Sequence, residues 1–331
     1  MMIKINRTAT AFTTAILLTL TLSGCLKYEK KANSHTSGTT TLICDNTFEN
    51  IMRQEVDIFE YQYPDAHILT RYATQAEALD SLMSLKTKTI VISRDLTDSE
   101  RESLKSRHRT PRSTKIAVDA VALIVNPANP VGKLTLSELA DILSGESKMW
   151  NDIRPVDNLG EIAVIFDHKA SSLVNYMRDS LLNGRELGPN VYAQGSIPEV
   201  FKTVMKNKNA IGVLGVSWIT TDMSSADLTP EELNNQIMSD APVQGATLVD
   251  SVKVLSIYRP GEARAYKPYQ ENIFNGTYPL FRQIYMITTG ASGSLAGGFY
   301  AFVTGDIGQK IIMKTGILPA RATRIQVVEL Q

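Results

Sequence analysis

The apolar run inside Lys115–Asn129 is the feature that most constrains how this chain can fold. The segment begins with alternating residues, continues as an unbroken apolar run over Val121–Val125, and ends at Asn126-Pro127. A short apolar run closed by a proline predicts a buried β-strand. Asp119 lies inside this strand, and burying an unpaired carboxylate costs on the order of several kcal/mol. Either a structural donor binds Asp119, or the strand lines a cleft.

Strands and helices alternate in the residues before this strand. Short apolar segments predict strands over Thr40–Cys44, His67–Tyr72 and Thr89–Ser93, and amphipathic segments predict helices over Phe48–Tyr61 and Thr74–Leu85. This β-α-β-α-β order predicts a mostly parallel sheet, in which ligands bind beyond the carboxyl ends of the strands. We therefore predict an α/β fold.

The alternation continues after the central strand. A capping box of Thr135 and Glu138 opens one helix, and Ser196 with Glu199 is interpreted as a second capping box. The polar segment 221–244 is predicted to be irregular. The other predicted elements are a helix over Leu96–Arg107, strands over Ile162–Phe166, Ala210–Val216, Leu248–Tyr258 and Gln283–Thr288, helices over Leu173–Leu182, Leu295–Val303 and Gly308–Lys314, and a short strand over Arg324–Leu330.

The N-terminus carries the pattern of a secretory signal. Lys4 and Arg7 precede an apolar stretch that is too short to span a membrane, and Leu22-Ser23-Gly24-Cys25 follows. This ending resembles a bacterial lipobox, which implies cleavage before Cys25, removal of the signal peptide 1–24, and acylation of the cysteine. Two or more acyl chains form a stable anchor. We therefore expect a lipid-anchored protein of the cell envelope, on the periplasmic or extracellular face of a bacterial membrane, with residues 25–39 as a flexible polar tether.

Composition excludes several classes of protein. Lys and Arg together number 34, as do Asp and Glu, so the formal net charge is zero, and no basic run indicates a nucleic-acid partner. With Cys25 acylated, Cys44 has no disulfide partner and is predicted to be a buried thiol. The four histidines show no metal-ligand spacing, and we expect no cofactor. No Ser-x-x-Lys set, Gly-x-Ser-x-Gly turn or P-loop indicates an enzyme.

Three predicted helices begin with a polar turn after a strand. Asp45-Asn46-Thr47, Ala170-Ser171-Ser172 and Gly195-Ser196 each place hydroxyl or amide groups at a helix start, where Asn46 or Thr47 can serve as the N-cap of the first helix. Such starts leave backbone N–H groups unpaired and carry partial positive charge. They are ordinary caps, or they converge on one anion.

Four segments resemble a known family. They read VDAVALIVNPANPVGKLTLSELADILSGESKMWNDI, NKNAIGVLGVSWI, YPLFRQIYMITT and FVTGDIGQKIIMKTGILPA. In this order and spacing the chain resembles the phosphate-binding lipoprotein of bacterial ABC phosphate importers, over most of residues 40–320. The resemblance implies a type II periplasmic-binding-protein fold: two lobes, each with a mostly parallel sheet flanked by helices, are joined by two hinge strands. Lobe 1 would hold residues 40–117 and 248–331, and lobe 2 would hold residues 118–247.

The resemblance also implies site residues. The ligand-binding positions carried over to this chain are Thr47, Phe48, Ser93, Arg94, Asp119, Ser171, Ser172 and Ser196. A carboxylate such as Asp119 can accept the proton of monohydrogen phosphate and so reject sulfate. The family then expects Arg, three residues and Ser-Gly-Thr, whereas this chain has Asp167 in place of the arginine, Ser172 in place of the glycine and Leu173 in place of the threonine. Arg94 or Lys169 could offset the missing charge.

The resemblance implies a monomeric solute-binding protein that captures inorganic phosphate, or a related small oxyanion, and delivers it to an ABC permease. The altered segment Asp167–Leu173 supports an alternative, a non-transport sensor or assembly protein with a diverged cleft on the same fold.

Overall fold

The computed structural model describes residues 33–220, 228–239 and 248–321. The predicted signal peptide, Cys25 and the predicted strand Arg324–Leu330 lie outside these residues. The last part of the predicted tether does not: the Ser34 N–H donates to the Ser37 carbonyl in a turn, and the first strand begins at Gly38. The prediction of a flexible tether up to residue 39 is therefore wrong for its last residues.

Two parallel groups of strands make up most of the sheet structure. The bounds of the strands are Gly38–Asp45 (β1), Ala66–Ala73 (β2), Thr89–Ile92 (β3), Arg112–Val125 (β4), Ala163–Phe166 (β6), Val191–Ala193 (β7), Ala210–Gly215 (β8) and Phe281–Thr288 (β12). In the first strand group, β1 pairs in parallel with β2 and β3. In the second strand group, β6 pairs in parallel with β7 and β8. This confirms the predicted mostly parallel α/β fold.

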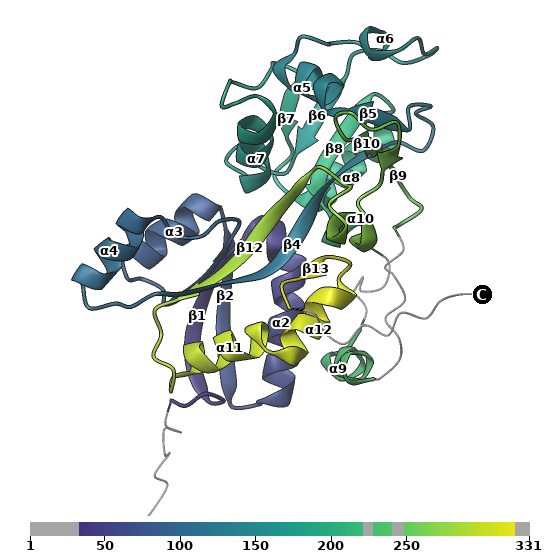
Figure 1. The fold of residues 1–331 in the computed structure, drawn as a ribbon. Coiled ribbons are helices and arrows are strands. Elements are labelled where there is room, and N and C mark those ends of the chain that lie inside the picture. The colour runs from purple at the N-terminus through teal and green to yellow at the C-terminus, as the bar shows by residue number, and fades with distance from the viewer. Residues whose placement is uncertain (1–32, 221–227, 240–247, 322–331) are drawn as a thin grey trace, which may run out of the picture. The chain divides into compact units, whose positions relative to one another are not determined.

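β4 and β12 join the two groups (Figure 1). β12 lies antiparallel between β3 and the first part of β4, and residues 121–125 of β4 pair with β8. β4 therefore runs from the first strand group into the second. Each residue of Val121–Val125 is fully buried, as the apolar run predicts.

Shorter strands complete the described sheets. β9 (Lys253–Val254) and β13 (Leu318–Pro319) pair with β4, while β5 (Lys133–Thr135), β10 (Ser256–Tyr258) and β11 (Ala265–Tyr266) form a separate sheet. Because β9 pairs with the end of β4, and β10 pairs with β5, residues 253–258 lie with the second strand group. These pairings indicate that the chain returns from the second strand group to the first near Leu280, whereas the predicted boundary is at residue 248. The lobe boundaries stay a prediction.

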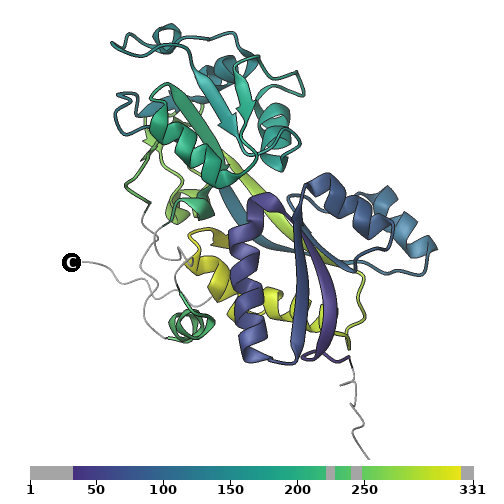
Figure 2. The same ribbon diagram turned by 180° about the vertical axis from the view of Figure 1, so that it is seen from behind.

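Helices cover the strands. Their bounds are Glu49–Gln62 (α2), Gln75–Met83 (α3), Asp98–Ser106 (α4), Leu136–Ser144 (α5), Trp150–Ile153 (α6), Ser172–Leu181 (α7), Ile197–Lys206 (α8), Pro230–Met238 (α9), Gln270–Phe274 (α10), Leu295–Thr304 (α11) and Asp306–Lys314 (α12), with 3-10 turns at Asn46–Phe48 (η1) and Val216–Trp218 (η2). Figures 1 and 2 show α3 and α4 on one side of the first strand group and α2, α11 and α12 on the other. No described helix is long and apolar enough to cross a bilayer.

Three local predictions are wrong. Neither Asn46 nor Thr47 caps α2; instead the Asp45 side chain accepts the Thr47 N–H within η1. The Ser196 side chain makes no cap hydrogen bond at the start of α8. Residues Pro230–Met238 are not irregular but form α9, because Thr229 and Glu232 make a capping box. The apolar residues of α9, Leu233 and Ile237, pack with Ile58 and Ile311.

Candidate functional site

A buried arginine lies where the two strand groups meet, and it is not among the ligand-binding residues predicted from the sequence. Arg282 is the second residue of β12, directly opposite Asp119 of β4, and its side chain is almost fully buried. Its Nε and Nη2 atoms donate to Asp119 Oδ2 at 3.3 and 3.1 Å. The donor that Asp119 required is therefore Arg282, on the neighbouring hinge strand.

The remaining donors of Arg282 reach both strand groups. Nη2 donates to the Thr47 hydroxyl at 3.0 Å, and Thr47 follows β1 of the first group. Nη1 donates to the Ser172 hydroxyl at 2.8 Å, and Ser172 begins α7 after β6 of the second group. The two hydroxyl oxygens lie 3.3 Å apart. One guanidinium thus connects residues from the carboxyl ends of β1 and β6, the edge where α/β sheets bind ligands.

Neighbouring residues fix the guanidinium. The Phe48 ring lies beneath it, with the Arg282 Cζ atom 4.4 Å from the ring centroid, which is a cation–π contact. The Val216 N–H donates to Asp119 Oδ1 at 3.2 Å. A Cβ atom added at Gly215 would lie 2.6 Å from Asp119 Oδ2, so a larger residue at this position would displace the carboxylate. We call Thr47, Phe48, Asp119, Ser172 and Arg282 the hinge cluster.

Further contacts hold the two groups together beside the hinge cluster. The Trp218 indole N–H donates to the Thr47 carbonyl at 3.0 Å. The Asn50 side chain donates to the Ser217 carbonyl at 2.7 Å. The start of α2 is thus hydrogen-bonded to η2, which follows β8 of the second group.

Two buried acids, Asp45 and Asp119, interact electrostatically with the Arg282 guanidinium. Asp45 Oδ1 accepts the Thr47 hydroxyl at 2.9 Å, while Oδ2 has no partner. Burial raises the pKa of Asp45 and of Asp119, and the nearby Arg282 guanidinium partly offsets each rise. Asp167, at the end of β6, is almost fully buried, and neither of its carboxylate oxygens has a partner.

The structure brings some of the predicted site residues together and not others. Thr47, Phe48, Asp119 and Ser172 meet in the hinge cluster. The Ser171 hydroxyl accepts the Leu173 N–H at 3.2 Å and so caps α7. Ser93 donates through both its N–H and its hydroxyl to Gln75 Oε1.

Two residues predicted to bind the ligand, Arg94 and Ser196, have no hydrogen bond to the hinge cluster in the described residues. Arg94 forms a bidentate pair with Glu100 of α4, with N–O distances of 2.9 and 2.8 Å. No hydrogen bond of the Ser196 side chain joins it to the hinge cluster in the described residues.

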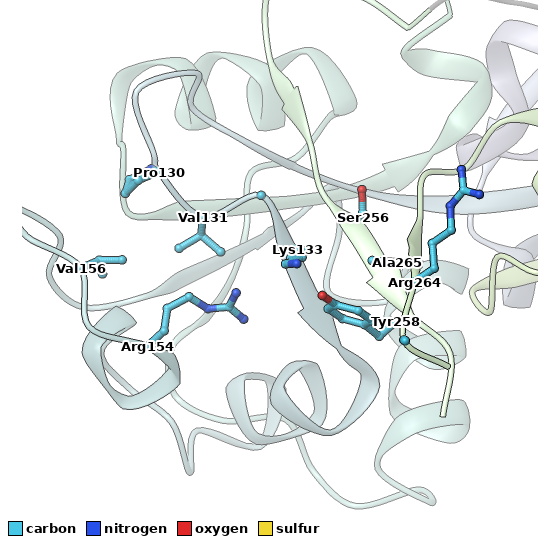
Figure 3. A pocket seen from close by; sticks show the side chains of 11 residues that line it. Pro130, Val131, Lys133, Arg154, Val156, Ser256, Tyr258, Arg264 and Ala265 are labelled. Carbon is cyan, nitrogen blue, oxygen red and sulfur yellow. The ribbon is translucent and has the colours of Figure 1, made fainter. Parts of the chain in front are cut away.

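A cavity of about 550 Å³ is lined by residues outside the hinge cluster, among them Lys133, Arg154 and Tyr258. Figure 3 shows the Lys133 and Tyr258 side chains next to each other, with the ammonium 5.1 Å from the ring centroid. Arg154 is already paired with Glu138 at 3.0 Å. The described residues contain no group of three His, Cys, Asp or Glu side chains that could hold a metal ion.

Comparison with known protein families shows to which family this chain belongs. The model of the PBP superfamily domain matches residues 29–306. The chain belongs to the PBP superfamily. Among PBP relatives, the phosphate-binding protein PstS of Pseudomonas aeruginosa is 24% identical over 317 residues, covering 89% of this chain and 87% of the relative. PstS of Staphylococcus epidermidis is 23% identical over 251 residues, covering 75% and 68%. The family resemblance seen in the sequence is confirmed.

Solved structures of the PBP superfamily share this fold. A putative phosphate ABC transporter substrate-binding protein with bound phosphate, from Clostridium perfringens, has a TM-score of 0.67 and 20% identity, covering 86% of this chain and 100% of that one. An ABC-type phosphate transport receptor from Vibrio cholerae has a TM-score of 0.61 and 20% identity, covering 85% and 100%. At these identities the matches establish the fold.

Proposed function

We propose that this protein captures phosphate, or a related small oxyanion, between its two strand groups. The observation that carries the proposal is the position of Arg282, whose buried guanidinium meets hydroxyls from both groups, Thr47 and Ser172. Arginine presents a fork of donors that matches the oxygens of phosphate, and hydroxyls add neutral donors beside it. Arg282 would supply from β12 the charge that the segment Asp167–Leu173 lacks.

Hinge motion would give the ligand access. β4 and β12 connect the two groups, and separation of the groups about these strands would part Thr47 from Ser172. Asp119 would keep the guanidinium oriented in both states, because the two residues lie opposite each other on the connecting strands. We propose Thr47, Phe48, Ser172 and Arg282 as the ligand contacts, with Ser171 at the helix start. Ser93 and Arg94 would contribute only after exchanging their present hydrogen-bond partners, Gln75 and Glu100, for the ligand. Ser196 stays a predicted ligand contact that has no hydrogen bond to the hinge cluster in the described residues.

Delivery would follow the pattern of the relatives, which are named as phosphate-binding proteins and transport receptors. The resemblance of residues 22–25 to a lipobox supports acylation at Cys25. The lipid would hold the protein at the periplasmic or extracellular face of a bacterial membrane, as a monomer that passes its ligand to an ABC permease. The names of the relatives describe binding rather than catalysis, which agrees with the prediction that the chain is not an enzyme.

Calorimetric titration of the purified protein with phosphate tests the proposal. We expect saturable binding with a dissociation constant on the order of micromolar or below. Arg282→Lys keeps the charge but loses the fork, and should weaken binding at least about tenfold. Arg264→Lys is the matched control, since Arg264 is exposed on the second half of the chain and stacks on Tyr266. Absence of binding by phosphate and all other oxyanions would refute the proposal.

The acids favour one alternative. Asp45, whose side chain contacts Thr47 of the hinge cluster, has an unpaired Oδ2 oxygen, which suits a diverged cleft better than a site for a dianion. A sensor or assembly protein on the same fold would show no change in thermal unfolding with phosphate, sulfate or phosphonates. It would nevertheless keep Arg282 as a structural connection between the two groups. Arg282→Lys would then lower the free energy of unfolding without affecting any oxyanion binding.

A further inference from the structure

The separate sheet of β5, β10 and β11 has one buried face and one polar face. Ile257 of β10 lies opposite Leu134 of β5, and both side chains are fully buried. Because side chains alternate along a strand, the residues on either side of these two point to the other face. Lys133, Ser256 and Tyr258 therefore share that face, where Lys133 is exposed and the other two are half-buried.

This polar face forms one wall of the cavity of about 550 Å³. The other walls include Val131, just before β5, and Arg154 and Val156, just after α6. Figure 3 shows the Arg154 guanidinium and the Tyr258 hydroxyl pointing toward each other, with the Lys133 side chain between them in this view. Hydrogen-bond donors from three separate segments of the chain thus line the same cavity.

The charge of this cavity is positive. Lys133, Arg154 and Arg264 line it, and none of the described residues that line it is an acid. Arg154 is paired through Nη2 with Glu138 at 3.0 Å, and Arg264 lies over a neighbouring tyrosine ring. The Lys133 ammonium, 5.1 Å from the centroid of the Tyr258 ring, pairs with no acid in the described part of the chain. Its charge is therefore available to an anion.

The size and the remaining lining of the cavity indicate the shape of the ligand. Pro130, Val131 and Val156 add apolar surface beside the donors. Cavities of about 300–1,000 Å³ that combine apolar walls with a few placed polar groups are typical sites for small organic molecules. An inorganic phosphate ion would contact the donors but would leave the apolar walls in contact with water. The cavity therefore suits an anion that carries an apolar body.

We propose that this cavity is a second ligand site, which binds a small organic anion with an oxyanion head and an apolar body. The head contacts the Lys133 ammonium and the Tyr258 hydroxyl, with Arg154 on the facing wall, and the body packs on Val131 and Val156. Lysine and arginine donate charge-assisted hydrogen bonds to oxyanions. Phosphomonoesters and carboxylates share this chemistry. These five residues lie outside the hinge cluster, so the second site goes beyond the proposed function.

Calorimetric titration of the unaltered protein tests the proposal with phenyl phosphate, benzoate and the neutral benzyl alcohol. The protein is held in inorganic phosphate just sufficient to saturate the hinge cluster, or without phosphate if that ion does not bind. We expect one or both anions to bind with a dissociation constant below about 1 mM, at least about tenfold more tightly than the alcohol. The anion that binds more tightly identifies the head group.

Equal binding of the anions and the alcohol, or no binding by any of the three, overturns the second site. The proposed function is decided separately, by the titration with phosphate alone.

Lys133→Met tests the named contact, because methionine keeps an unbranched side chain and loses the charge. The variant should lose at least about tenfold in affinity for the more tightly bound anion and change by less than about twofold for inorganic phosphate. Lys148→Met, at an exposed position between α5 and α6, is the control for net charge and should change neither. Unchanged affinity of Lys133→Met, or an equal loss in both variants, overturns the proposal. If thermal unfolding shows that Lys133→Met does not fold, the three ligands on the unaltered protein still decide.

Discussion

Arg282 lies directly opposite Asp119 on the two antiparallel strands that join the strand groups, and its Nη2 atom donates to Asp119 Oδ2 at 3.1 Å. Both side chains are buried, so the pair has lost its hydration and depends on its own hydrogen bonds. The pair therefore ties the stability of the hinge to the geometry of the candidate site.

Removing one partner of this pair should destabilise the fold strongly. Asp119→Asn leaves the guanidinium buried without its counter-charge, and we expect a loss of roughly 3–5 kcal/mol in the free energy of unfolding, measured in urea. Asp179→Asn breaks an exposed pair with Arg178 and should cost under about 1 kcal/mol. The double variant Asp119→Leu with Arg282→Met should be more stable than Asp119→Asn. Unchanged stability of Asp119→Asn would contradict the pairing.

The two adjacent serines should separate stability from affinity. Ser171 caps α7, so Ser171→Ala should cost about 1 kcal/mol in the free energy of unfolding. Ser172 contacts Arg282 and Thr47, so Ser172→Ala should weaken oxyanion binding about tenfold, as titration would measure. Equal effects of the two variants on affinity would place both hydroxyls at the ligand.

Part of this site could be predicted from the sequence. The family resemblance implied Thr47, Phe48, Asp119 and Ser172, and these residues meet because each follows or lies within a strand that the apolar pattern predicts. Arg282 was missed, because it lies one position before the predicted strand Gln283–Thr288, whereas β12 begins at Phe281. Its partner Asp119 lies 163 positions earlier in the chain, and only the register of β12 against β4 brings the two together. Local spacing carries no information about such a pairing.

Other errors have local physical causes. Ser93 was predicted to end a strand and directly follows β3, which ends at Ile92, but the Gln75 side chain at the start of α3 accepts both of its hydrogen bonds. α9 was missed because its polar residues outnumber the apolar ones, and its two buried side chains gain their burial from α2 and α12. Hydropathy alone does not reveal a helix that is stabilised by tertiary packing.

Arg94 should not contribute to ligand binding in the present geometry. Its bidentate pair with Glu100 lowers the pKa of that carboxyl to about 2. Arg94→Gln should leave oxyanion affinity within about twofold and raise the Glu100 pKa toward about 4.3, which NMR titration would follow. Because the folded pKa is depressed, the pair stabilises the fold above about pH 4.3 and loses this effect as the pH falls toward 2. A tenfold loss of affinity would instead assign Arg94 to the site.

Glu55 should make stability fall as the pH rises. This residue of α2 is fully buried, neither carboxylate oxygen has a partner, and burial raises its pKa well above the usual range. A raised folded pKa means that stability is fully present below the unfolded pKa of about 4.3 and is lost as the pH rises through the folded pKa. Glu55→Met should therefore raise the free energy of unfolding by roughly 1–3 kcal/mol at pH 7.5 and by less at pH 4, measured by urea unfolding at both pH values. The exposed control Glu231→Met, on α9, should show no such dependence. A gain that is equal at the two pH values would mean that Glu55 titrates normally and that only its shape matters.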